Sequence, residues 1–116
     1  MSYVIVGFES RIAAHGCALS IAGAARERSV KVCGAALARR DTLRAIHVDP
    51  VEGFEMPEHA LGVLDGIVAE SAGRPSLRMG ETALLVLLAD LPKDDVDDLI
   101  DRIDLERRGA LWVTTA

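Results

Sequence analysis

The chain has 116 residues, of which half are hydrophobic, and its formal net charge is −5. A chain of this length buries one core but not two, so we expect a single domain over residues 1–116. Its four aromatic residues and acidic charge balance offer few platforms for base stacking and little attraction for phosphates. The composition therefore disfavours nucleic-acid binding.

The sequence also disfavours a membrane span and secretion. The longest apolar run, residues 83–89, is far shorter than the roughly 20 residues of a membrane-crossing helix. The first residues lack the basic and apolar regions of a secretory signal, so we expect a cytoplasmic protein. Cys17 and Cys33 form no Cys-x-x-Cys pair, and we expect two reduced thiols and no metal site.

Charge is distributed unevenly along the chain. Residues 1–50 carry seven Lys or Arg and four Asp or Glu, a balance of +3, whereas residues 51–116 carry six and fourteen, a balance of −8. Two interpretations remain open: the basic half of one subunit contacts the acidic half of another, or the halves form differently solvated faces. The chain has no Asn and no Gln, which excludes catalysis by a carboxamide of this chain.

The first elements in chain order are a strand and a helix with small side chains. Residues 3–8 alternate in hydrophobicity and predict a strand, and Ser10 is a natural N-cap for a helix that runs toward Arg28. Gly16 and Gly23 lower the intrinsic stability of this helix, so it needs close packing. Its expected inner stripe, at helical spacing, consists of His15, Ala18, Leu19, Ala22 and Ala25.

The middle of the chain predicts a β-hairpin followed by a helix. Residues 30–38 and 43–48 are rich in β-compatible side chains, and the polar connection at 39–42 has the length of a hairpin turn. Proline and glycine then predict an irregular loop at 51–56. Apolar residues recur at helical spacing over 57–72, which predicts a connecting helix.

The last third predicts a strand, a helix and a strand. Residues 81–89 are apolar on both faces, which is typical of a central, covered strand. Asp90 is the expected N-cap of a helix with Pro92 in its first turn, and residues 110–115 form the final strand. The inward face of this helix is expected to consist of Val96, Leu99, Ile100 and Ile103.

The order of these elements predicts the fold class. A first half at residues 1–49, a connecting helix at 57–72 and a second half at 80–115 give the order βαββ-α-βαβ. This order predicts an α+β sandwich of the ferredoxin-like kind, with the helices mainly on one face of the sheet.

Two groups of residues are candidates for ligand binding. His15 and His47 are expected to approach each other across the helix–sheet layer, where two imidazoles are able to bind a metal; ordinary structural histidines are the alternative. Arg39 and Arg40 at the expected hairpin tip, with Arg44 nearby, suit a phosphate or a carboxylate. The alternative for the arginines is an ordinary charged turn.

Other motifs give no support for an enzyme. Residues 94–98 (DDVDD) match the Asp-Asp-x-x-Asp pattern of prenyl-transferring enzymes. Those enzymes are large all-helical proteins, however, and acids in the first turn of a helix are stabilised by its dipole. The Gly-rich nucleotide-binding signatures and the Gly-x-Ser-x-Gly signature of hydrolases do not occur in the sequence. We therefore predict no catalytic residues and no cofactor.

The strand segment MGETALLVLLAD at residues 79–90 is followed by LPKDDV at 91–96 and by the closing strand LWVTT at 111–115. This arrangement resembles a family of small bacterial proteins of unknown function, in which a Gly-Thr/Ser-Ser-Ala-Leu-like strand leads through Asp and Pro into a helix and a final strand. Some members carry a Gly/Ala-rich membrane hairpin between the two halves, which is absent here. The resemblance implies a ferredoxin-like βαββ…βαβ organisation and no established catalytic residues.

Two functional hypotheses follow from the sequence. The first is a non-enzymatic accessory or stress-related module that forms a homo-oligomer, most simply a dimer, through its edge strands and its small-sided helix. The second is a small-ligand or metal-binding protein, or a dimeric enzyme, that uses His15, His47 and the three arginines. Convergence of these residues in space distinguishes the two hypotheses.

Overall fold

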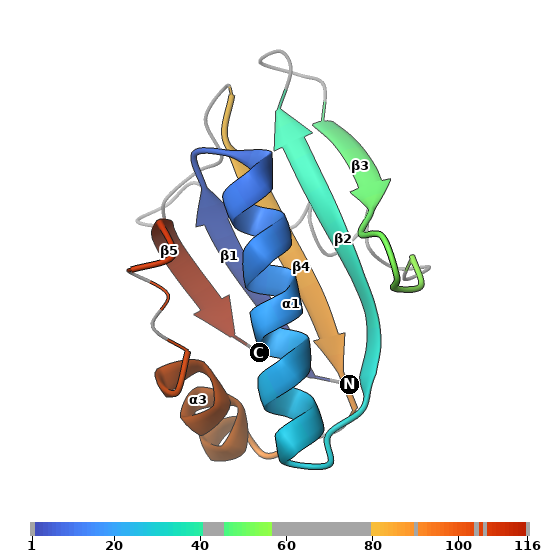
Figure 1. The fold of residues 1–116 in the computed structure, drawn as a ribbon, viewed down its shortest axis with the longest axis vertical. Helices are drawn as coiled ribbons and strands as arrows, with labels where there is room; N and C mark the ends of the chain where they lie inside the picture. Colours follow the sequence, from blue (N-terminus) through green and yellow to red (C-terminus); the bar gives the residue numbers. More distant parts are fainter. Residues whose placement is uncertain are drawn as a thin grey trace.

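The computed structural model describes residues 2–40, 46–56, 80–89, 91–103, 105 and 107–115, which form an α+β structure as predicted (Figure 1). In chain order the described elements are β1 (Ser2–Phe8), α1 (Arg11–Glu27), β2 (Val32–Arg40), β3 (Ile46–Pro50), β4 (Thr82–Leu88), α3 (Lys93–Asp101) and β5 (Ala110–Thr115). The connecting helix predicted at 57–72 lies outside the described residues. Neither described helix is long and apolar enough to cross a membrane.

The five described strands form one antiparallel sheet in the order β3-β2-β4-β1-β5. β4 lies at the centre, and all seven of its residues are buried. The prediction of a central, covered strand is therefore confirmed. Its side chains are apolar on both faces, so only a position covered on both sides removes all of them from water.

Two strand–helix–strand units interleave in this sheet. β1 and β2 are both antiparallel to β4, which lies between them, and they are connected by α1. In the same way β4 and β5 lie on either side of β1 and are connected by α3. β3 is added outside β2 as an edge strand. This arrangement is compatible with the expected ferredoxin-like fold.

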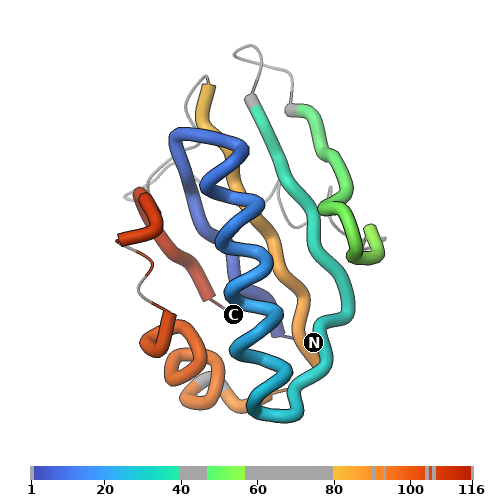
Figure 2. Tube along the Cα trace, viewed as in Figure 1, coloured from blue at the N-terminus to red at the C-terminus, as the bar shows by residue number. Residues whose placement is uncertain are grey.

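Both described helices contribute to the larger of two cores, on one face of the sheet. The trace in Figure 2 shows α1 lying lengthwise over the strands, with α3 beside its C-terminal end. The Ser10 hydroxyl caps α1, as predicted, by accepting a hydrogen bond of 3.2 Å from the Ala13 amide. The buried side of α1 consists of Ala14, Cys17, Ala18, Ile21 and Ala25. Because most of these side chains are small, the helix packs close to the sheet.

The start of α3 differs from the prediction. Pro92, not Asp90, occupies the N-cap position, and it makes no side-chain capping hydrogen bond. The reason lies in the preceding residue. The Ser2 hydroxyl donates a hydrogen bond of 3.0 Å to the Leu91 carbonyl and accepts one of 3.2 Å from the Leu91 amide, so the chain is held there before the helix begins. The predicted inner residues Val96, Leu99 and Ile103 are buried, and Ile100 packs against them.

The opposite face of the sheet carries a second, smaller core. Ile5, Ala36, Ala38 and Leu85 are fully buried there, with Tyr3, Cys33, Val48 and Trp112 packed beside them. Gly7 of β1 faces Trp112 of β5 in the ladder, and the indole lies against the glycine backbone. Gly7 therefore provides the space that Trp112 occupies.

Candidate functional site

The first turns of α1 and the end of β3 enclose a recess on the helix side of the sheet. Its volume is about 350 Å³, and His15 contributes a half-buried side chain to it. The described residues that line it are Arg11, Ile12, His15, Leu37, Pro50, Val51 and Glu52. One of the predicted ligand-binding residues therefore lies in a recess of the size that small molecules occupy.

An ion pair connects α1 to β3 beside this recess. Arg11 Nη1 lies 3.8 Å from Asp49 Oδ2, and the two side chains are 58% and 43% exposed. Pairs that are this exposed contribute only about 0–1 kcal/mol to stability, because water competes for both charges. The pair is therefore better suited to orienting the two side chains than to holding the elements together.

Arg39 and His47 lie directly opposite each other in the β2–β3 ladder. Facing residues of an antiparallel ladder share one side of the sheet, with Cβ atoms about 4.5–5.5 Å apart. Leu37 belongs to the helix-side core, so Arg39, two residues further along β2, lies on the same side. Both Arg39 and His47 are exposed, and neither is among the described residues that line the His15 recess. The structure thus brings two of the predicted residues together and places His15 in a separate recess.

The prediction that Arg39 and Arg40 form a hairpin tip is wrong. They are the last two residues of β2, and Arg40 faces Ile46 in the ladder. The strand continues this far because it pairs on both sides: Arg39 faces His47 on one side and Thr82 on the other. Two ladders of backbone hydrogen bonds outweigh the turn preference of a polar segment. Arg44 lies outside the described residues.

The two thiols differ in environment. Cys17 is buried and Cys33 is half-buried, and both are free. Burial raises the pKa of the Cys17 thiol to about 11, and the positive charge of Arg108 offsets only part of that rise. Cys17 is therefore protonated at neutral pH and is a poor nucleophile. Within the described part of the chain, no three His, Cys, Asp or Glu side chains are grouped so as to hold a metal ion.

The solvent side of α1 carries the most exposed large apolar side chains of the described helices. Ile12 is 87% exposed and Leu19 is 55% exposed. Gly16 and Gly23 lie between and beyond them at helical spacing, with open space around each. We call these four residues the outer face of α1. The expected inward position of Leu19 is wrong, because Cys17 and Ile21 define the row that contacts the sheet and Leu19 projects from the opposite side.

Sequence reasoning named this helix as a contact surface but did not identify the row of residues that faces solvent, although a signal for that row exists. The positions 12, 16, 19 and 23 follow the spacing of three and four residues that places side chains on one side of a helix. The same helix also has a second such row, and composition does not tell which row faces the sheet. Both rows contain small and apolar residues, so the tertiary structure decides between them.

A second exposed apolar pair lies on the edge strand β5. Leu111 is 45% exposed and Val113 is 40% exposed. Val113 faces Val6 in the ladder, and Val6 belongs to the helix-side core, so Val113 lies on the same side of the sheet as α1. Leu111 lies at the irregularity of this ladder opposite Gly7 and Phe8. The pair serves as a matched comparison for the outer face of α1.

Comparisons with protein-family models, with curated proteins and with solved structures found no match for this chain. The geometry of the described residues therefore carries the functional conclusion. It provides an apolar helix face directed to solvent and a recess lined by charged and polar side chains, Arg11, His15 and Glu52 among them.

Proposed function

We propose that this chain is a non-enzymatic accessory module of ferredoxin-like fold that self-associates through the outer face of α1. The fold assignment is supported by the interleaved strand order β2-β4-β1-β5, to which β3 adds one edge strand. The observation that carries the functional proposal is the exposure of Ile12 and Leu19 on one side of α1. Large apolar side chains gathered on one helix face are typical of a contact surface.

The outer face is complementary to a second copy of itself. When two α1 helices pack antiparallel about a two-fold axis near residues 17 and 18, Ile12 faces Gly23 of the partner subunit and Leu19 faces the partner subunit's Gly16. Each large side chain thus meets a glycine, which has no side chain to keep the helices apart. Helices pack closely when the large side chains of one fit into the spaces between side chains of the other.

The charges at the two ends of α1 fit the same arrangement. The two-fold axis that pairs Ile12 with the partner's Gly23 also places the exposed Glu9, just before α1, beside the partner's exposed Arg26. Two such pairs of opposite charge form in the dimer. A parallel arrangement would place like charges together, so the ends favour the antiparallel pairing.

The expected affinity is modest. Each Ile or Leu side chain transferred from water contributes about 1.5–3 kcal/mol when fully buried, and a dimer buries two from each subunit. Association costs an estimated 4–15 kcal/mol in lost freedom of motion. The two ranges overlap, so we expect a dimer that dissociates on dilution.

Sedimentation velocity over a range of concentrations tests the proposal. We expect the natural chain to dimerise, and Leu19→Lys and Ile12→Lys each to shift it to monomer. Leu111→Lys is the matched control, because it removes an exposed leucine from β5 and should leave the dimer unchanged. Circular dichroism confirms that each variant is folded.

A charge exchange provides an independent test of the antiparallel register. Glu9→Arg and Arg26→Glu should each weaken the dimer, and the two changes together should restore it. A natural chain that stays monomeric at all concentrations, or a dimer that survives Leu19→Lys and is lost in Leu111→Lys, contradicts the proposal.

A second candidate function is small-ligand binding at the His15 recess. It is favoured by the position of His15, Arg11 and Glu52 around one recess of about 350 Å³. Native mass spectrometry of protein purified without added metal tests it, because a retained mass that disappears in His15→Ala supports this function. Retention of the same mass in His15→Ala contradicts it.

A further inference from the structure

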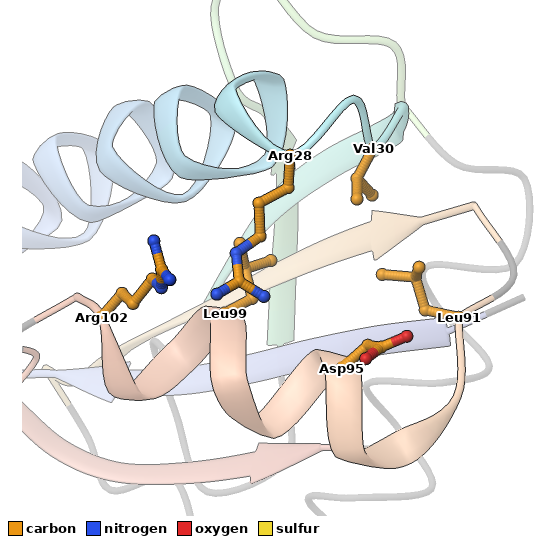
Figure 3. A pocket seen from close by; sticks show the side chains of 6 residues that line it. All are labelled: Arg28, Val30, Leu91, Asp95, Leu99 and Arg102. Atoms are coloured by element: carbon orange, nitrogen blue, oxygen red, sulfur yellow. The ribbon is translucent and has the colours of Figure 1, made fainter.

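A pocket lies where the C-terminal end of α1 meets α3, away from the outer face of α1 and from the His15 recess. Figure 3 shows its side chains arranged around the space between the two helices. The described residues that line it are Arg28, Val30, Leu91, Asp95, Leu99 and Arg102. Its volume is about 440 Å³, which is within the range of small-molecule sites.

The floor of this pocket is apolar and belongs to the main core. Leu99 is fully buried, and Val30 and Leu91 are half-buried side chains that pack against the helix-side core. Leu91 is also fixed by its two hydrogen bonds with the Ser2 hydroxyl. The floor is therefore a rigid surface that suits an aliphatic group.

Three charged side chains surround this floor. Their backbone positions are set by the ends and the spacing of the two helices. Arg28 is the C-cap of α1, and its amide donates to the Ala25 carbonyl at 3.1 Å. Arg102 is the C-cap of α3, and its amide donates to the Asp98 carbonyl at 3.3 Å. Asp95, Leu99 and Arg102 follow helical spacing and so share one side of α3, the side that faces the pocket.

These three charges have no partners among the described side chains. Among the residues that the structure describes, no side chain forms an ion pair or a side-chain hydrogen bond with Arg28, Asp95 or Arg102. In Figure 3 the guanidinium group of Arg28 lies over Leu99, that of Arg102 stands beside Leu99 and points toward α1, and the Asp95 carboxylate lies toward Leu91. The pocket thus has a positive region and a negative region on either side of an apolar floor.

We propose that this pocket binds a free α-amino acid with an aliphatic side chain. The carboxylate of the ligand accepts hydrogen bonds from Arg28 and Arg102, whose planar guanidinium groups match a carboxylate. Its ammonium group donates to Asp95, and its side chain covers Leu91 and Leu99. A simple anion satisfies the arginines alone, whereas a zwitterion also satisfies Asp95, which is why the three charges together select this class.

Titration of the isotope-labelled protein with L-leucine, followed by NMR, tests the proposal. We expect saturable shifts at Val30, Leu91 and Leu99. Leucinamide lacks the carboxylate and should produce no saturable shift, and 4-methylpentanoate lacks the ammonium group and should bind several-fold more weakly than leucine. Arg28→Gln and Arg102→Gln should each weaken leucine binding about tenfold or more, the usual effect of losing a charge-assisted hydrogen bond.

Asp95→Asn distinguishes a zwitterion site from a general anion site. We expect this variant to lose the preference for leucine over 4-methylpentanoate. Arg11→Gln is the matched control, because Arg11 lies in the His15 recess, and it should bind leucine as the natural chain does. The NMR spectrum itself confirms that each variant is folded.

Three outcomes would overturn the proposal: no saturable shift with leucine, binding unaffected by both Arg28→Gln and Arg102→Gln, or equal affinity of the natural chain for leucine and 4-methylpentanoate. The subunit number is measured on the same samples by sedimentation. If leucine does not bind, the sedimentation result therefore still tests self-association through α1 independently.

Discussion

The contact between Gly7 and Trp112 gives a quantitative test of the packing on the second face of the sheet. A Cβ atom added in Gly7→Ala would overlap Nε1 and Cε2 of the indole and lie 2.8 Å from Cδ1. All three atoms belong to the five-membered part of a rigid ring, so no flexible chain end is able to move aside. The indole has to shift as a whole.

The expected cost follows from the size of this overlap. Overpacking a well-filled core typically costs about 1–3 kcal/mol, which exceeds the ~0.4–1 kcal/mol that Gly→Ala gains by restricting the unfolded chain. We expect Gly7→Ala to lower the free energy of unfolding by about 1–2 kcal/mol. In domains of about 100 residues, each kcal/mol lowers Tm by about 4–8 °C.

Fluorescence and thermal unfolding measure this effect, because Trp112 is the single tryptophan of the chain. Gly7→Ala should lower Tm and shift the indole emission to longer wavelength as the ring becomes more exposed. Trp112→Ala provides the paired variant, since alanine has no ring atoms at the positions of Nε1, Cε2 and Cδ1. It also removes the indole N–H, which is buried without a hydrogen-bond partner among the described residues. The variant at Trp112 should therefore lose less free energy of unfolding than is usual when a buried aromatic side chain is truncated.

A double-mutant cycle decides whether the clash is the cause. Gly7→Ala should cost clearly less in the Trp112→Ala background, with a coupling of about 1 kcal/mol or more. If Gly7→Ala lowers Tm equally in both backgrounds, or leaves Tm and emission unchanged, the reasoning from close packing is refuted.

Three further predictions concern single side chains. Ser2→Ala should lower the free energy of unfolding by about 1–2 kcal/mol, measured by urea denaturation, because both hydrogen bonds to Leu91 are lost. Ser10→Ala should cost about 1 kcal/mol by the same assay, and Ser10→Asp should retain most of the stability because it also caps α1. The Cys17 pKa is raised to about 11 in the folded protein from an ordinary 9.0, so the unfolded chain releases this proton first as pH rises. Stability should therefore fall between these two pH values by up to about 2–3 kcal/mol. This part of the pH dependence should be missing in Cys17→Ala, and an unchanged dependence would contradict the assignment.

Several elements were predictable because their signal is local. The Ser10 cap, the apolar β4 and the final strand depend on short-range periodicity and on capping chemistry, and each lies where the sequence placed it. Arg39 and Arg40 were misplaced because β2 continues through them: both pair with β3, and Arg39 also pairs with Thr82 of β4, which is distant in sequence. Local turn preference carries no information about those partners.

The candidate surfaces also combine features that are visible in the sequence with features that only the tertiary structure shows. The spacing of Ile12, Gly16, Leu19 and Gly23 is visible in the sequence, but the choice of which side of α1 faces water depends on how Cys17 and Ile21 fit the sheet. The pocket of Figure 3 combines Arg28 at the end of α1 with Asp95 and Arg102 on α3. No pattern along the chain connects these residues.

The sequence by itself determined the α+β class, the central strand and the ends of the main helix, because backbone hydrogen bonding and hydrophobic periodicity act over a few residues. The tertiary structure alone decided the strand order, the solvent side of α1 and the meeting of Arg28 with Asp95 and Arg102. These features depend on contacts between segments far apart in the chain, where the shape and volume of packed side chains, rather than local preference, select the arrangement.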